Sequence, residues 1–111
     1  MDRQTDQGAM LAARHTPNPT AESPSRDDLE ARLHRDAAAG LRWWSTGPGD
    51  AFDWHTHDLP KVLFCHAGSI TFHTREGDLS LGPGDRLDLD PGTEHAATIG
   101  AEGCECVEAF A

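Results

Sequence analysis

Turn-forming residues recur along most of the chain at intervals of about ten residues, and they limit the segments between them to short strands. The sequence has 111 residues, of which 11 are glycine and 7 are proline. From Leu41 onward, glycine and proline separate short apolar segments that we predict to be strands: 41–45, 52–57, 62–66, 69–74, 78–81, 85–89, 95–99 and 105–110. This pattern favours an all-β sandwich or barrel over a helical bundle.

The N-terminal part of the chain has a different character. Residues 1–24 combine prolines with threonine, serine and asparagine and offer little apolar surface to bury, so we predict a flexible arm. Ser25 and Asp28 have the spacing of a capping box, and apolar residues follow at every fourth position. We therefore expect a helix over about 26–39 that ends before Gly40. The predicted organisation is an arm, a helical segment and a barrel, over residues 1–24, 25–40 and 41–111.

Charge and cysteine content narrow the range of partners and compartments. The net charge of −10 and the pI near 4.9 argue against binding to nucleic acid or to anionic membrane surfaces. The three cysteines form an odd set, which does not suggest a secreted disulfide framework. The first residues are polar and resemble no signal peptide, and no apolar run has membrane-spanning length. The sequence therefore predicts a cytoplasmic protein.

Two groups of histidines lie among glycines within the predicted barrel. The first group, in chain order, consists of Gly49, His55, His57, Lys61 and Gly68. The second group consists of Gly84, Asp85, Asp90, Pro91, Gly92 and His95. In spacing and residue type, these groups resemble the two sequence motifs of the cupin superfamily. The resemblance covers about Gly47 to Ile99, and it identifies the chain as similar to small single-domain cupins, or monocupins.

The resemblance implies a fold and a metal centre. Cupins hold a metal ion inside a small β-barrel with two histidines of the first motif and one of the second. We therefore expect one small cupin barrel of the jelly-roll type, preceded by the helix and the arm, with one divalent transition metal ion on His55, His57 and His95. Small cupins commonly pair, so a homodimer is expected. Lys61 is a departure, because most cupins carry a glutamate ligand at that position.

The cupin fold alone does not fix a reaction, because it supports several kinds of enzyme as well as binding and storage proteins. The leading prediction is a metal-dependent enzyme that acts on a small polar or anionic molecule, of the dioxygenase, isomerase or lyase type. The alternative is a non-catalytic module that binds a metal or a ligand, such as a sensor. No helix-turn-helix pattern accompanies the barrel, which weakens a regulatory role within this chain.

The residue types agree with the predicted metal centre. His55 and His57 are two residues apart, so on a strand both side chains would point to the same face. His95 opens a later strand, which a barrel can bring alongside the first. Three neutral imidazoles suit zinc, iron, nickel, copper or manganese. Asp53 has the same parity and is an alternative fourth ligand, although aspartates at strand entries more often accept backbone hydrogen bonds.

Lys61 is expected to face the barrel interior, together with Leu63 and Cys65. Lysine is a poor metal ligand, because its amine must first lose a proton. Three roles for Lys61 remain open. It can bind an anionic group of a substrate beside the metal, it can donate or accept a proton, or it can form an internal salt bridge.

The remaining candidates have simpler interpretations. Cys65 is a reactive thiol in the cavity or, more simply, a small buried residue. Cys104 and Cys106 could form a second metal site only with further ligands. His66 and His73 are expected at the surface. Trp43 and Trp44 belong to the core, to a dimer interface or to a pocket wall.

Overall fold

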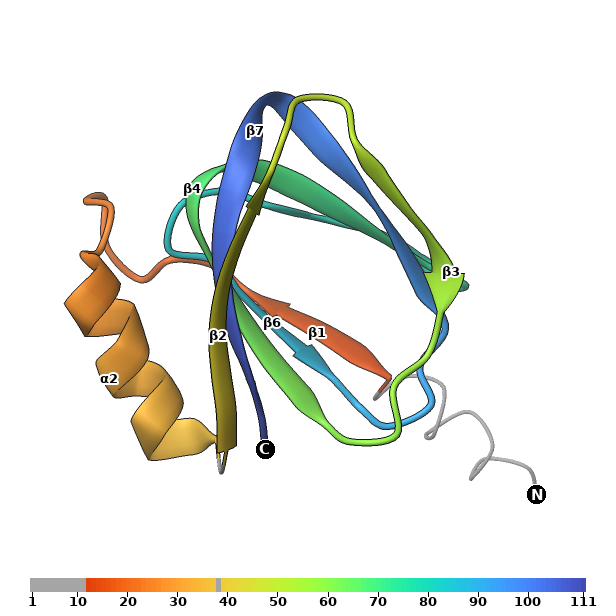
Figure 1. The fold of residues 1–111 in the computed structure, drawn as a ribbon, viewed down its shortest axis with the longest axis horizontal. Coiled ribbons are helices and arrows are strands. Elements are labelled where there is room, and N and C mark those ends of the chain that lie inside the picture. Colours follow the sequence, from red (N-terminus) through yellow and green to blue (C-terminus); the bar gives the residue numbers. More distant parts are fainter. Residues whose placement is uncertain (1–11, 38) are drawn as a thin grey trace.

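The structure is a computed structural model that describes residues 12–37 and 39–111. In chain order, its elements are β1 (Ala13–Thr16), α2 (Arg26–Asp36), β2 (Ala39–Thr46), β3 (Ala51–His55), β4 (Lys61–Thr74), β5 (Gly77–Leu81), β6 (Arg86–Leu89) and β7 (His95–Phe110). The strands pair antiparallel in the order β1-β6-β4-β7-β2, with β3 also on β7 and β5 also on β4. The sheet curls around an interior space, and α2 lies outside it, beside β2 (Figure 1). The predicted all-β barrel with one helix is confirmed.

The two longest strands join segments that we had predicted to be separate. β4 pairs with β7 along both of their lengths, from Lys61 opposite Phe110 to Thr74 opposite His95. Gly68 and Gly103 lie inside these strands and not between them. Both have positive φ angles, of 74° and 78°, and the pairing register shifts close to Gly68. The glycines therefore bend continuous strands, because only glycine adopts this backbone geometry without strain.

β4 separates two hydrophobic clusters, one on each of its faces. Leu63 and Cys65 face the barrel interior, as predicted, where they pack with residues from β5, β6 and β7. Val62 and Phe64 point the other way and pack against Leu29 of α2. This alternation explains why the strand reads as a continuous apolar run, since both of its faces are buried.

The helix begins as predicted but ends earlier. The Ser25 side chain accepts a hydrogen bond from the Asp28 backbone N–H, and the Asp28 side chain accepts one from Ser25 in return. α2 ends at Asp36 because Ala37 adopts an extended backbone, with φ −129° and ψ 156°. Gly40 belongs to β2 and does not cap the helix. No helix in the described ranges is long and apolar enough to cross a membrane.

Part of the predicted flexible arm belongs to the sheet. Ala13–Thr16 form β1, which pairs with β6 residue by residue. The His15 ring in β1 and the Asn18 backbone N–H just beyond it both bond to the carboxylate of Asp85. The prediction of one flexible segment over 1–24 is therefore wrong for residues 13–16, and residues 1–11 lie outside the described ranges. A strand of only four residues, whose apolar content is low, leaves little signal in the sequence.

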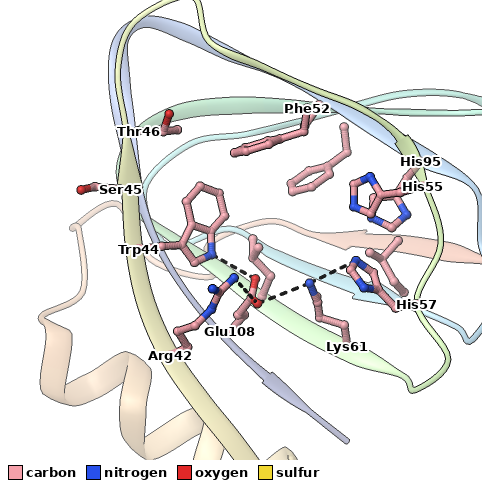
Figure 2. Close-up of a pocket in the computed structure, with 14 residues that line it drawn as sticks. Arg42, Trp44, Ser45, Thr46, Phe52, His55, His57, Lys61, His95 and Glu108 are labelled. Atoms are coloured by element: carbon pink, nitrogen blue, oxygen red, sulfur yellow. Dashed lines mark hydrogen bonds and ion pairs between the residues drawn. The ribbon is translucent and has the colours of Figure 1, made fainter.

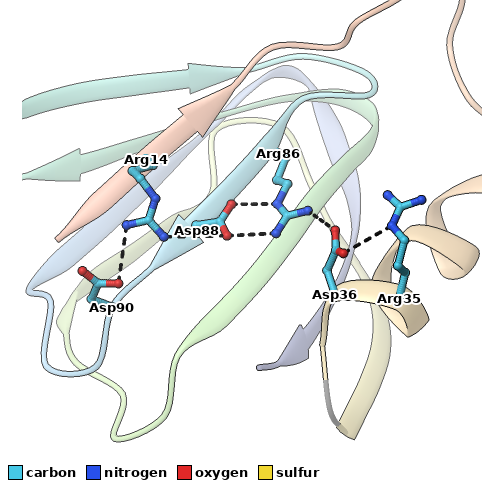
Figure 3. Close-up of polar contacts among 6 residues, drawn as sticks. All are labelled: Arg14, Arg35, Asp36, Arg86, Asp88 and Asp90. Atoms are coloured by element: carbon cyan, nitrogen blue, oxygen red, sulfur yellow. Dashed lines mark hydrogen bonds and ion pairs between the residues drawn. The ribbon is translucent and has the colours of Figure 1, made fainter. Parts of the chain in front are cut away.

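Charged side chains connect β1, β6 and α2 on the outer surface. Arg86 donates hydrogen bonds to both carboxylate oxygens of Asp88 and to Asp36 at the end of the helix (Figure 3). Arg14 forms ion pairs with Asp88 and Asp90 (Figure 3). The two carboxylates beside Arg86 raise the pKa of its guanidinium. These contacts fix the N-terminal strand and the helix to β6.

The close approach of the two bends makes a testable prediction. A Cβ atom on Gly68 would lie 2.0 Å from the Gly103 carbonyl oxygen, whereas a Cβ atom on Gly49 would meet nothing within 4 Å. The two glycines have nearly equal φ angles, of 74° and 76°. Gly49→Ala should therefore lower the free energy of unfolding by about 1–2 kcal/mol from backbone strain alone. Gly68→Ala should cost at least about 2 kcal/mol more, because backbone atoms must move apart.

Denaturant unfolding of both variants beside the unchanged protein measures this difference. Equal losses of stability in the two variants would show that the contact between β4 and β7 at this bend is not as close as the structure has it.

Candidate metal centre

A cavity of about 380 Å³ occupies the barrel interior. Its lining side chains come from β2, β3, β4, β6 and β7 and from the segment between β3 and β4 (Figure 2). Apolar side chains of Trp44, Phe52 and Phe72 form part of the wall. His55, His57, His95, Lys61 and Glu108 line the same space. The structure thus brings the three predicted metal ligands and Lys61 into one cavity.

The three histidines come together from three different positions in the chain. Each offers one ligand atom, and these atoms all lie within 4.8 Å of one another. His55 ends β3 and is the pairing partner of His95, which begins β7. His57 lies two residues beyond the end of β3, and its carbonyl oxygen accepts a hydrogen bond from the Gly92 N–H. The prediction that both histidines lie on one face of the same strand is therefore wrong, because only His55 belongs to β3. His57 is positioned instead by its hydrogen bond to the turn at Gly92.

Backbone carbonyl groups fix the orientation of two of the imidazole rings. His55 Nδ1 lies 2.6 Å from the Asp53 carbonyl oxygen, and His95 Nδ1 lies 2.9 Å from the Thr93 carbonyl oxygen. Because a carbonyl oxygen only accepts hydrogen bonds, each Nδ1 must carry the proton. In the neutral ring, Nε2 then has a free lone pair. Metal-binding histidines commonly have such outer hydrogen bonds, so this donor set fits a borderline transition metal.

The surroundings of the imidazoles favour their neutral form. Burial lowers the pKa of His57 to about 4, and the positive charge of Lys61 contributes to the shift. Burial also lowers the pKa of His95, although the hydrogen bond to Thr93 acts in the opposite direction. His95 is buried, His57 is partly buried and His55 is exposed. Near neutral pH, His57 and His95 are therefore in the form that binds a metal ion.

Lys61 points into the cavity, as predicted, and contacts two groups there. Its Nζ lies 3.3 Å from His57 Nε2 and 3.4 Å from Glu108 Oε2 (Figure 2). Only 11% of its side chain is exposed. An ammonium group only donates hydrogen bonds, so His57 accepts with its Nε2 lone pair. The internal salt bridge, one of the three roles left open for Lys61, is present in the structure.

Glu108 is the cavity residue that the sequence analysis missed. Its carboxylate is buried and accepts hydrogen bonds from Trp44 Nε1 at 3.0 Å and from Arg42 at 3.2 Å, in addition to the contact with Lys61. The available signal was the alternation along the last strand, which puts Glu108 on the same face as Cys106, and Cys106 belongs to the core inside the barrel.

The other candidate ligands do not join the histidine group. The Asp53 carboxylate accepts a hydrogen bond from the backbone N–H of Trp54. Cys65, Cys104 and Cys106 are all buried in the core, and none lines the cavity. Among the described residues, His55, His57 and His95 are the one group of three or more metal-binding side chains. A second metal site at the cysteines is therefore not supported.

His66 and His73 lie away from the cavity lining. His66 contacts Glu105 and the edge of the Trp43 ring, beside the helix. His73 contacts Asp78 and Thr98. Of the two tryptophans, Trp43 packs in the cluster beneath the helix and Trp44 forms part of the cavity wall.

Comparison with known proteins identifies the family. A family model described as the AraC-like ligand binding domain matches residues 45–106, which is more than half of the chain. The chain belongs to this family. The matched segment contains all three histidines and Lys61. Comparison with curated proteins gives no match.

Solved structures of cupins are similar to the chain over most of its length. A DUF861 family protein from Thermotoga maritima is 13% identical, with a TM-score of 0.60 over 89% of this chain and 99% of that chain. A cupin-2 domain containing protein from Shewanella frigidimarina is 16% identical, with a TM-score of 0.55 over 96% of this chain and 89% of that chain. The chain thus has the fold of a small cupin, as its two motifs predicted.

A further similar structure comes from a study of the DMSP lyases RdDddP and RnDddQII. It is 27% identical, with a TM-score of 0.56, and the match covers 63% of this chain. The match covers only 35% of that chain, so the likeness concerns one part of a longer protein.

The contact between Lys61 and His57 predicts a change in the titration of His57. In the metal-free protein, histidine NMR signals should give His57 a pKa of about 4, against an ordinary value of 6.5. Lys61→Met should raise this pKa, but not fully to 6.5, because burial is the larger cause. The unfolded chain takes up the proton near pH 6.5 and the folded chain does so only near pH 4. This group therefore lowers stability as the pH falls through that range. An unchanged pKa of His57 in Lys61→Met would show that the ammonium does not lie beside the ring in solution.

Proposed function

We propose that this protein binds one divalent transition metal ion through His55, His57 and His95 and acts on a small anionic molecule held beside it. The observation that supports this proposal best is the shared cavity, in which three oriented imidazoles and two cationic side chains meet. Zinc, iron, nickel, manganese and copper are all compatible with a ligand set of three nitrogens. A bound metal ion would supply Lewis-acid or oxygen-binding chemistry.

The charges in the cavity favour an anionic ligand. Lys61 and Arg42 are the cationic side chains of the lining and Glu108 is its carboxylate, so the cavity has an excess of one positive charge before any metal binds. A divalent ion would raise that excess. A carboxylate or phosphate group would therefore be attracted to the space between the histidines and Lys61, where the Lys61 ammonium can donate a hydrogen bond.

The wall of the cavity would orient such a ligand and exclude water. The Trp44 and Phe52 rings meet edge to face at 5.7 Å, and Phe72 lies beside His95 at 6.4 Å between ring centroids. Trp44 is held by its hydrogen bond to Glu108. Rigid apolar surfaces around a few polar groups are typical of sites for small molecules. Electrostatic interactions inside such a wall are stronger than in open water.

The reaction class stays a proposal, of the dioxygenase, isomerase or lyase type. The likeness to a structure from a study of DMSP lyases supports a lyase among these. A second candidate is a module that binds its ligand without turnover, and the AraC-like ligand-binding family favours it. Both candidates use the same cavity. They differ in whether a bound ligand is released unchanged, which mass spectrometry of the recovered molecule would decide.

Metal content tests the proposal. Protein purified without a histidine tag and incubated with zinc, iron, nickel, manganese or copper salts should retain about one equivalent of one of these metals per chain. His55→Ala removes an exposed ligand with little effect on packing and should abolish tight retention. His66→Ala, which changes a histidine outside the cavity, should leave the content unchanged.

Elemental analysis of the dialysed proteins provides the measurement. Less than about a tenth of an equivalent in the unchanged protein, with every metal, would contradict the proposal.

A further inference from the structure

The position of Lys61 conflicts with simple binding of a metal ion at His57. All three imidazoles need a free nitrogen lone pair to bind the ion, and His57 shows its lone pair at Nε2. That lone pair is directed at the Lys61 ammonium, whose Nζ is 3.3 Å away. A hydrogen bond to a cation and a bond to a metal ion cannot use the same lone pair at the same time. His55 and His95 have no such contact, because their Nδ1 atoms bond to backbone carbonyl groups.

Lys61 has a second partner besides His57. The Glu108 carboxylate lies 3.4 Å from Nζ, on the side of the ammonium away from His57 (Figure 2). Glu108 is almost wholly buried, so its charge needs cationic partners whether or not the lysine contacts His57. The lysine side chain is flexible, with an ammonium that rotates freely among acceptors. A small movement can therefore break the contact with His57 and keep the salt bridge with Glu108.

We infer that Lys61 is an internal cation that occupies the metal-binding nitrogen of His57 in the metal-free protein, and that it withdraws to Glu108 when a metal ion binds. This inference rests on the proposed function, because it assumes that the three histidines bind a metal. It assigns Lys61 a regulatory role. The lysine lowers the affinity of the site for metal, so that weakly binding ions do not displace it from His57.

Withdrawal also changes what Lys61 can do next. Once its ammonium no longer donates to His57, one of its N–H groups is free to donate to an anionic ligand. Binding of a metal ion and binding of an anion are then coupled through Lys61 in addition to their direct attraction. Such coupling is reciprocal, so an anion that holds Lys61 away from His57 raises the affinity for metal.

The affinity for Zn²⁺ alone tests the inference. Dissociation constants would be measured by competition with a chromophoric chelator for the unchanged protein, Lys61→Met and Arg42→Met. Arg42 is the matched control, because it also lines the cavity and contacts Glu108 but does not contact a histidine. Lys61→Met should bind Zn²⁺ at least about 10-fold more tightly, since both a competitor and a nearby positive charge are removed. Arg42→Met should change the affinity much less.

The possible results separate the inference from the proposed function. Equal tightening in Lys61→Met and Arg42→Met would reflect general charge alone and would overturn the inference. Unchanged or weaker binding in Lys61→Met would also overturn it, while Zn²⁺ binding by the unchanged protein would leave the proposed function standing. Binding in Lys61→Met without binding in the unchanged protein would show that Lys61 does not withdraw from His57, and it would overturn both the inference and the proposed function. Binding in neither protein would overturn both.

A fold control keeps the test decisive. Thermal melting of each variant checks that the barrel is intact, because removing Lys61 leaves Glu108 with fewer partners. If Lys61→Met fails to fold, Lys61→Gln retains a hydrogen-bond donor to Glu108 without the positive charge. A smaller tightening is expected of Lys61→Gln, because its amide can still donate to His57 but carries no charge, and weaker or unchanged Zn²⁺ binding in that folded variant would overturn the inference.

Discussion

The pairing of β4 with β7 is the interaction on which the rest of the structure depends. It extends from Lys61 opposite Phe110 to Thr74 opposite His95, so one end of the pair carries a histidine and the other carries the lysine. β7 also provides Glu108, and β3 pairs with the start of β7, which places His55 opposite His95. Because both long strands bend at glycines, their halves curve around a common space. The cavity and its ligands are a direct consequence of this register.

The second constraint is the buried carboxylate of Glu108. A charge removed from water is tolerated only with partners, and Glu108 has Lys61, Trp44 and Arg42. This gives a physical reason for a lysine at position 61. A second carboxylate at that position would lie close to Glu108, and two like charges in a partly buried cavity would repel each other. The lysine instead neutralises Glu108 and places one positive charge beside His57.

Much of the fold and of the histidine cluster could be predicted from the sequence, because the signals were local. Turn residues marked the strands, Ser25 and Asp28 marked the helix start, and the two motifs identified the histidines. The parts that were missed depend on pairing between distant segments. Gly68 was interpreted as a break, although it is a bend inside a continuous strand. β1 is ordered by its partner β6 and not by its own composition.

Glu108 illustrates the same limit at the site. Residues 106–109 of the last strand are all buried, so the Glu108 carboxylate must find its partners inside the protein. The sequence shows that side chains on this strand alternate between its two faces. It does not show which other strands supply the hydrogen-bond donors for Glu108. The partners of Glu108 come from β2 and β4, which lie far from it in the chain. Only the three-dimensional arrangement connects Glu108 to Lys61 and so to His57.

X-ray absorption spectroscopy of the metal-loaded protein tests the central claim most directly, because it identifies the atoms around the ion. With zinc or cobalt bound, the account predicts nitrogen ligands at about 2.0–2.1 Å, with the scattering pattern of three imidazoles and no sulfur. A sulfur atom at about 2.3 Å would place the ion at the cysteines of the core, and scattering from fewer than two imidazoles would remove it from the histidine cluster. Either result would contradict a metal centre formed by His55, His57 and His95.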